Sequence, residues 1–533
     1  MCSSDLSNTA FLHAADPVHR NDGTPVRIAS ETGSILANHA SIVSTAEATL
    51  ISAGRDIAGL GLELQNIAAG DVSSVRAGRD LRFPILRNAL TGQLDSSIDD
   101  LPISVAGPGL LQVTAGRNFD LGTSAGITSV GSLTNPALSS RGANISVWAG
   151  LNREPDYQAF IKAYLGKANG YGDALTKYLR AMSGDSGLSR ADALSRFKAL
   201  PEASQQEFIL AVLFRELKAA GIAAARQTDA ARRARFYRRG EKAVSTLFPG
   251  SDYQGDIKLF FSRIQTLAGG DISLLAPGGL IDVGLASAFS GSKTAADLGI
   301  VAQGQGNIGG LARGDVAVNE SRVFTLGGGD ITVWSERGDI DAGRGAKAAL
   351  AAPAPIYAFD AKGNLVVTFP PSVSGSGIRA QSGSIGTDFG ADATRSPLTM
   401  AFASAAKAAA RYGDVTLVAP RGVVNAGEAG IGGRNVAIAA TAIIGLNNIQ
   451  AGASLTGAPP PAPNLTAVMS GASNLTAAVA DTAEAALNDH LAAASEQVAK
   501  ASSSAPVNLI RVDLLGFGEC SAADIRQGGV GCK

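Results

Sequence analysis

Two Arg-Gly-Asp triplets are the clearest candidates for chemistry in this sequence of 533 residues. The triplets consist of Arg313, Gly314, Asp315, Arg337, Gly338 and Asp339. An exposed triplet of this kind is an integrin-type adhesion motif. The second triplet also falls inside a repeated pattern, in which its glycine and its aspartate are typical turn residues. The sequence therefore predicts either an adhesion motif or a pair of structural turns at these six positions.

Acidic residues offer a second kind of chemistry, the cleavage of acidic polysaccharides. Asp282, Asp341 and Arg344 would line one groove if the segments that carry them were stacked closely. A site built on histidine is hard to assemble, because the chain has only four histidines and all lie outside the main repeats. The repeated aspartates also lack the nonapeptide spacing of a calcium-binding array. The preferred prediction is a chain without catalytic, cofactor-binding or metal-binding residues.

A basic run at 232–242, "RRARFYRRGEK", is a candidate contact surface for polyanions. Its cations are Arg232, Arg233, Arg235, Arg238, Arg239 and Lys242. The segment 152–266 has 19 Lys and Arg against 12 Asp and Glu, a balance of +7, whereas the whole chain has a net charge of -1. We expect the run either to contact lipopolysaccharide, a host glycan or an acidic protein face, or to be a solvated helix surface. The near-neutral chain indicates no nucleic-acid partner.

Three segments of the chain follow one template of sixteen residues. They are "GGDISLLAPGGLIDVG" (269–284), "GGDITVWSERGDIDAG" (328–343) and "YGDVTLVAPRGVVNAG" (412–427). In each copy, inward and outward residues alternate over a short strand, and a glycine-bearing turn leads to a second short strand. Two such strands bury their apolar face only by stacking on the next copy. The template predicts a parallel β-helix or solenoid, with ordinary β-sandwich turns as the alternative.

A shorter motif predicts the length of one coil, because "AGRDI" (53–57) and "AGRDL" (77–81) start 24 residues apart. The predicted segments are a poorly defined start at 1–27, β-helix coils at 28–151, an α-helical insertion at 152–266, further coils at 267–456 with a hairpin excursion at 350–372, a Pro/Ala/Ser-rich linker with an Ala-rich helix at 457–505, and a final strand with a Cys loop at 506–533. Within the insertion, Ser204 and Glu207 follow Pro201 with the spacing of a capping box, which predicts a helix start there.

Membrane and export signals are missing from the sequence. The longest apolar stretch, "VAIAATAIIGL", is far shorter than the ~20 residues that a membrane span needs. The first residues lack the basic and apolar regions of a signal peptide. We therefore expect either a cytoplasmic protein or a piece of a longer one, and the repeats favour the piece. Cys520 and Cys532 are close enough in sequence to close a small loop in an oxidising compartment.

Three blocks of the sequence resemble a known family. "LGGGDITVWSERGDIDAGRGAK" (326–347), "PPSVSGSGIRAQSGSIG" (370–386) and "LLGFGE" (514–519) are similar to the C-terminal part of filamentous haemagglutinin family exoproteins of Gram-negative bacteria. The resemblance runs from about residue 50 to residue 519. It implies a right-handed β-helix that is secreted or held at the cell surface and adheres to a host-cell glycan or matrix protein. It also implies two-partner secretion through an outer-membrane pore partner.

The sequence departs from the family's full-length pattern, because the N-terminal secretion domain and the signal peptide are missing. We therefore expect the C-terminal portion of a larger exoprotein, or a truncated gene model. Some adhesins similar to this family keep a C-terminal disulfide loop that lodges at the pore, so the resemblance implies such a loop for Cys520 and Cys532, with two thiols that are unpaired or bond elsewhere as the alternative. The preferred function is structural and adhesive, without enzymatic activity. The alternatives are a β-helix enzyme acting on acidic polysaccharide and the stalk of a contact-dependent toxin carrier.

Overall fold

The computed structural model describes residues 23–37, 41–95, 101–132, 138–167, 170–285, 293, 297–344, 350–351, 356–359, 365–368, 373–380, 397–402 and 413–457. The predictions for 458–533, which include the Ala-rich helix, the last strand and the pair Cys520 and Cys532, lie outside these residues. Most of the predicted segment 1–27 lies outside them too. None of the described helices is long and apolar enough to cross a membrane.

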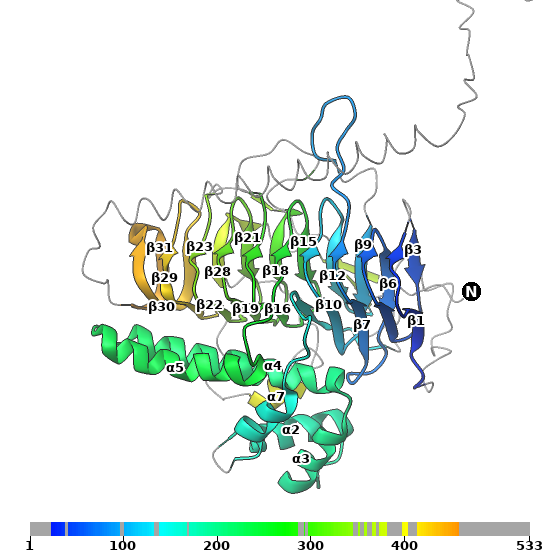
Figure 1. Cartoon of the computed structure of the whole chain (residues 1–533), viewed down its shortest axis with the longest axis horizontal. Helices are drawn as coiled ribbons and strands as arrows, with labels where there is room; N and C mark the ends of the chain where they lie inside the picture. Colours follow the sequence, from blue (N-terminus) through cyan, green and yellow to red (C-terminus); the bar gives the residue numbers. More distant parts are fainter. Residues whose placement is uncertain are drawn as a thin grey trace, which may run out of the picture. The chain divides into compact units, whose positions relative to one another are not determined.

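Short parallel strands dominate the described chain and form one continuous ladder of 27 strands. Each strand pairs with the third strand after it, so three consecutive strands make one coil and successive coils stack (Figure 1). This arrangement confirms the predicted parallel β-helix. We refer to the stacked coils from β1 to β31 as the shaft, and the strands of the shaft form three rows.

The first row contains β1 (Val26–Ser30), β4 (Thr49–Ala53), β7 (Val72–Ala77), β10 (Leu110–Ala115), β13 (Asn144–Trp148), β16 (Ile272–Ala276), β19 (Ile308–Ala312), β22 (Ile331–Ser335), β29 (Val415–Asn425) and β30 (Ile431–Ile444). The second row contains β2 (Ile35–Leu36), β5 (Ile57–Ala58), β8 (Leu81–Arg82), β11 (Phe119–Asp120), β14 (Ile257–Lys258), β17 (Ile281–Asp282), β20 (Val316–Ala317) and β23 (Ile340–Asp341). The third row contains β3 (Ile42–Ser44), β6 (Gly61–Gln65), β9 (Pro102–Ala106), β12 (Gly126–Val130), β15 (Arg263–Thr266), β18 (Gly299–Ala302), β21 (Arg322–Thr325), β28 (Gly377–Ala380) and β31 (Ile449–Thr456). The long strands β29 and β30 also continue into the second row.

Apolar side chains that recur at the same position of each coil fill the interior of the shaft. Ile57 of β5 pairs with Leu81 of β8, and both are buried, so the two Ala-Gly-Arg-Asp motifs are separated by one coil as predicted. Two template copies stack in the same way, with Ile331 paired to Val415. Burying one such side chain typically contributes about 1.5–3 kcal/mol. The repeated aliphatic positions therefore supply a continuous column of hydrophobic stabilisation.

The repeated Asp or Asn of the template caps the neighbouring coil. Oδ1 of Asn144 accepts a hydrogen bond from the backbone N–H of Asp271 at 2.7 Å. Asp271 accepts in the same way from Asn307 at 2.7 Å, and Asn307 accepts from Asp330 at 2.9 Å. Asp330 then accepts from Asp414 at 3.0 Å. Each rung satisfies a backbone donor, at about 1 kcal/mol net, which explains why an acid or amide recurs at this position.

Helices form a separate insertion between β13 and β14. They are α1 (Tyr157–Phe160), the π-helix η2 (Ile161–Leu165), α2 (Gly172–Ser183), α3 (Arg190–Ala199), α4 (Glu202–Ala225) and α5 (Ala230–Leu247). The shaft resumes at β14, before the predicted boundary at residue 266. The predicted capping box is wrong, because α4 begins at Glu202 directly after Pro201 and therefore already contains Ser204 and Glu207. Proline suits the residue before a helix, since its φ is fixed and its missing N–H is not needed there.

The helices α4 and α5 form a hairpin that lies lengthwise along the first row of the shaft (Figure 1). Glu207 of α4 bonds Asn144 on β13, and Gly221 of α4 packs against Val418 on β29. Fourteen helical residues rise about 21 Å, and the four strand steps from β13 to β29 span about 19 Å. The helix pitch therefore matches the coil spacing closely enough for one helix to contact five consecutive coils.

The returning helix α5 follows the same row in the opposite direction. Arg233 near its start donates to the carbonyl of Ala440 on β30 at 2.8 Å. Phe248, which follows its end, contacts Trp148 on β13 edge to face, with 5.5 Å between ring centroids. The hairpin buries a second apolar cluster, whose shaft members are Trp148, Leu275, Leu311, Trp334, Val418, Ala437 and Ala439. These side chains point outward from the coils, so the shaft has two apolar surfaces along this row.

The predicted hairpin excursion is present between β23 and β28. Strand β25 (Ile356–Phe359) pairs antiparallel with β26 (Leu365–Thr368), and β24 (Leu350–Ala351) pairs antiparallel with β27 (Val373–Ser374). The residues 360–364 between β25 and β26 lie outside the described residues. Two short helices complete the elements, α7 (Pro397–Phe402) and the 3-10 helix η4 (Leu446–Asn448).

Candidate functional site

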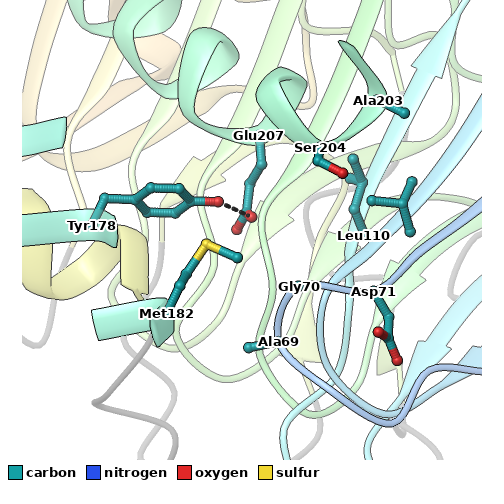
Figure 2. A pocket seen from close by; sticks show the side chains of 10 residues that line it. Ala69, Gly70, Asp71, Leu110, Tyr178, Met182, Ala203, Ser204 and Glu207 are labelled. Carbon is teal, nitrogen blue, oxygen red and sulfur yellow. Dashed lines mark hydrogen bonds between the residues drawn. The ribbon is translucent and has the colours of Figure 1, made fainter. Parts of the chain in front are cut away.

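A partly buried acid lies in the seam, the contact surface between the insertion and the first row of the shaft. Glu207 of α4 accepts hydrogen bonds from the hydroxyl of Tyr178 on α2, at 2.8 Å, and from Nδ2 of Asn144 on β13. Figure 2 shows Tyr178 directed toward Glu207 beside a small cavity. The volume of this cavity is about 10 Å³, enough for one water molecule at most. The cavity in the seam is therefore a packing feature and not a ligand site.

The seam shifts the ionisation of its acid. Burial raises the pKa of Glu207 to about 7, although the hydrogen bond from Tyr178 and the positive charge of Arg141 act to lower it. Burial also raises the pKa of the Tyr178 phenol well above its usual range. A carboxyl with a pKa of about 7 changes its charge near neutral pH, which predicts that the strength of the seam depends on pH.

Ion pairs hold the seam further along α4. Nζ of Lys218 lies 2.8 Å from a carboxylate oxygen of Asp330 and 3.3 Å from one of Asp414. These two acids belong to the template ladder on neighbouring coils, and the Lys218 side chain is 19% exposed. Close packing adds to the charge pairing. Phe214 of α4 lies so close to Gly309 of β19 that a Cβ added at Gly309 would be 2.5 Å from the phenyl ring. The insertion is thus fixed to the shaft coil by coil.

A larger cavity lies on the insertion itself, and we call it the tyrosine cleft. Its volume is about 270 Å³, near the lower end of the range for small-molecule sites. The cleft is lined by Ala163, Tyr164, Lys167, Gly170, Tyr171, Glu216 and Arg239. These residues come from the π-helix, the segment before α2, and the helices α4 and α5. Two aromatic rings with a few charged groups form the kind of lining that binds small polar molecules.

The charged groups of the tyrosine cleft form one connected network. Nε and Nη2 of Arg239 each donate to a carboxylate oxygen of Glu216 at 2.7 Å, and the hydroxyl of Tyr171 donates to Glu216 at 2.6 Å. Burial acts to raise the pKa of Glu216, but these hydrogen bonds outweigh it and leave the pKa below its usual value. The Glu216 side chain is 8% exposed and that of Arg239 is 52% exposed. Glu216 therefore stays ionised and holds the guanidinium of Arg239 in a fixed orientation.

The structure places the two Arg-Gly-Asp triplets on neighbouring coils, stacked on one another. The backbone N–H of Arg337 donates to the carbonyl of Arg313 at 2.8 Å. Oδ1 of Asp315 accepts from the N–H of Asp339 at 2.7 Å, and Asp339 accepts from the N–H of Val423 at 2.7 Å. The turn glycine is needed there, because a Cβ on Gly338 would lie 2.4 Å from a backbone nitrogen of the neighbouring coil. Both aspartates serve as turn caps, and receptor binding by the triplets stays a prediction.

The cations of the basic run do not share one environment. Arg233 is 8% exposed and bonded to the shaft, so it does not belong to the outer surface. Arg239 is held in the tyrosine cleft. The remaining cations of the run, Arg232, Arg235, Arg238 and Lys242, are exposed and are not held in the tyrosine cleft. The run is therefore a helix of the insertion with an exposed cationic side and a side bound to the shaft.

The residues proposed for polysaccharide cleavage lie near one another on the second row. Asp282 and Asp341 occupy the same column, with Ala317 between them. Asp282 accepts a hydrogen bond from Nδ2 of Asn319 at 2.7 Å, and burial raises its pKa to about 7. The backbone N–H of Arg344 donates to the carbonyl of Asn319 at 3.0 Å. Each of the two carboxylates also accepts from a backbone N–H two residues later, which is a turn-capping role, and cleavage stays an untested prediction.

Sequence patterns missed both the seam and the tyrosine cleft. The spacing of Ser204 and Glu207 indicates a capping box, whereas Glu207 lies inside α4 and bonds Asn144 of the shaft. Glu216 and Arg239 meet only because α4 and α5 fold back on each other, and no local spacing indicates such a pair. The seam did leave a signal. Outward positions of the template carry Leu275, Trp334 and Val418, and apolar residues on both sides of a strand indicate a covered sheet.

The architecture defines a parallel β-helix that carries a docked helical insertion. Residues 328–460, which include β22, β29, β30 and β31, match a family described as filamentous haemagglutinin family outer membrane protein. This match confirms the resemblance seen in the template block. No curated protein and no solved structure gives a significant match to the chain. The description of this family points to an adhesin-like protein associated with an outer membrane.

Proposed function

We propose that the chain is a structural and adhesive segment of a bacterial exoprotein, exported by two-partner secretion through an outer-membrane pore partner. The family match over 328–460 and the parallel coils support this proposal. In this role the shaft is a rigid spacer. The insertion is the surface that contacts a polyanionic host-cell glycan or matrix component.

The exposed side of α5 is the observation that carries the proposal. Its opposite side is fixed, because Arg233 and Tyr237 are buried and Gly240 packs against Trp334. The outer side presents four exposed cations, Arg232, Arg235, Arg238 and Lys242. Clustered cations on a rigid support attract polyanions and raise their association rate. The attraction weakens with salt, because exposed charges are screened.

The test is binding of the whole purified chain to heparin, the polyanion probe, and to an array of glycans and matrix proteins. A variant with Arg232, Arg235, Arg238 and Lys242 changed to Gln should bind far more weakly. The control removes four exposed cations elsewhere on the insertion, Lys162, Lys177, Arg196 and Lys198, and should bind as the unchanged chain does. Equal binding by the two variants would remove this side of α5 from the proposal.

Deletion of the insertion is a poor test of the same idea. The insertion covers apolar side chains of the shaft, including Trp148 and Trp334, both fully buried. Removing it would expose these side chains in one continuous row, and large exposed apolar patches cause aggregation. Charge substitutions on α5 leave the seam intact and therefore separate binding from folding.

A further inference from the structure

We propose that the tyrosine cleft binds a single sugar acid, with the carboxylate on Arg239 and Lys167 and the sugar ring against Tyr164 and Tyr171. The proposal deepens the adhesive function, because a sugar acid is a unit of the anionic glycans that the insertion would meet. Apart from Arg239, which also belongs to α5, the cleft uses none of the exposed cations of the heparin test, Arg232, Arg235, Arg238 and Lys242. Four features of the cleft carry it, namely a held guanidinium, two held rings, a local positive charge and a limited volume.

The guanidinium of Arg239 is arranged to receive an anion. Glu216 takes its Nε and Nη2 groups in a two-point contact, at 2.7 Å each. The two hydrogen bonds to Glu216 use Nε and Nη2, and Nη1 takes part in neither of them. Arginine has five N–H donors in a rigid plane that matches a carboxylate. The contact with Glu216 therefore fixes the plane of the guanidinium and leaves donors for a ligand.

The two aromatic rings of the cleft are also held in place. Tyr164 stacks on Phe160, with 4.5 Å between ring centroids and an angle of 29° between the rings. Tyr171 contacts the edge of Phe402 at 6.3 Å between centroids, and its hydroxyl is bonded to Glu216. Both tyrosines are partly exposed. Held rings lose little freedom on binding, so they offer preformed apolar walls for the C–H groups of a sugar ring.

Charge and size narrow the ligand to one anionic ring. The carboxylate of Glu216 is occupied by Arg239 and Tyr171, and the exposed Lys167 adds a positive charge that Glu216 does not neutralise. A neutral sugar would leave these donors without an anion, and a simple carboxylate would leave the tyrosine walls empty. The volume of about 270 Å³ is small for a pocket that binds drug-sized molecules, and it suits a single ring.

The test measures binding of glucuronate, glucose and acetate to the full chain by isothermal titration calorimetry. We expect saturable binding of glucuronate that is at least about tenfold tighter than that of glucose or acetate, since a hydrogen bond to a charged group carries that much affinity. Lys167→Gln should weaken glucuronate at least about fivefold and leave glucose unchanged. The control Lys177→Gln removes an exposed lysine on α2 and should change neither the affinity for glucuronate nor that for glucose.

A second variant tests the positioning of Arg239 without removing a ring. Tyr171→Phe keeps the aromatic wall and deletes the hydroxyl that bonds Glu216, so it should weaken glucuronate more than glucose. Equal affinity for all three probes, or no saturable binding of glucuronate, overturns the proposal. An equal effect of Lys167→Gln and Lys177→Gln overturns it as well. Because the three probes are small monovalent or neutral molecules and not polyanions, their failure leaves the heparin test of α5 unaffected, and failure of the heparin test leaves this one unaffected.

Discussion

The substitution Glu207→Gln tests how the insertion is held on the shaft. In the seam the pKa of Glu207 is about 7, compared with an ordinary value of 4.5, because burial disfavours the carboxylate. The docked state therefore keeps a proton that the undocked state releases between these two pH values. A raised pKa contributes stability that is fully present below the unfolded value and is lost as the pH rises through the folded value. Docking should weaken from about pH 4.5 to pH 7.

The size of this effect follows from the same two values. A difference between 4.5 and about 7, at about 1.4 kcal/mol per pKa unit, corresponds to about 3 kcal/mol of docking free energy. Glutamine keeps the shape of the side chain and an oxygen that accepts from Asn144, but it does not ionise. The docking free energy of the variant should therefore be nearly the same at every pH. Above pH 7 the insertion of the variant should dock more tightly than that of the unchanged chain.

The assay is hydrogen exchange of the α4 amides in the full chain between pH 5 and pH 8, with intrinsic exchange corrected at each pH. Amides of α4 that exchange through undocking should lose protection as the pH rises in the unchanged chain, and the loss should disappear in Glu207→Gln. Glu202→Gln, on the exposed first turn of the same helix, is the control and should keep the pH dependence. Equal pH dependence in Glu207→Gln and the unchanged chain would refute the assigned role of Glu207.

Three further substitutions test other contacts. Gly240→Ala should lower the melting temperature, although alanine normally stabilises a helix interior by about 1 kcal/mol, because the new Cβ would lie 2.4 Å from Trp334. Lys218→Met should weaken docking by about 1–3 kcal/mol, because it leaves the carboxylates of two coils without their donor, and it should speed proteolysis of the insertion. Asp339→Asn should leave the melting temperature within about 1 °C, because the amide oxygen can accept the bond from Val423, while it destroys the second Arg-Gly-Asp triplet.

Matched controls separate these effects from general damage. Ser245→Ala and Lys198→Met change exposed positions of α5 and α3, so neither should alter docking. A melting temperature of Gly240→Ala at or above that of the unchanged chain would contradict the close contact with Trp334. Unchanged proteolysis of Lys218→Met would show that its ion pairs do not hold the seam. Unchanged adhesion of cells to Asp339→Asn would mean that the second triplet is not an adhesion site.

Local patterns were sufficient to predict the coils of the shaft. Alternation around Ile331 and the turn glycine Gly338 depend only on neighbouring residues, and the spacing of Ile57 and Leu81 predicts the length of a coil. Each coil repeats the same pattern of alternating strand residues and turn glycine, so one motif predicts many strands. The hydrogen-bonding role of Asp330 followed from the same reasoning about turns.

Contacts between distant segments explain what the patterns missed. The tyrosine cleft needs Glu216 and Arg239 to meet across a helical hairpin, and their spacing along the chain carries no period. The lengthwise docking of α4 depends on agreement between the rise of a helix and the spacing of coils. Such an agreement is a property of the assembled fold. The local sign of this docking in the sequence is an apolar residue at an outward strand position, such as Trp334, which is fully buried.

The lengthwise hairpin also constrains the order of folding. Coils mostly contact their immediate neighbours, whereas Lys218 pairs with Asp414, 196 residues later, and Arg233 bonds Ala440, 207 residues later. Contacts of such separation form slowly, because a long loop must close first. The coils can therefore stack one after another, whereas the helical hairpin of α4 and α5 docks completely only after β29 and β30 have formed. Until then the parts of α4 and α5 that contact β29 and β30 have no shaft surface to pack on, so slow stacking of the last coils, rather than the first, would expose the chain to aggregation.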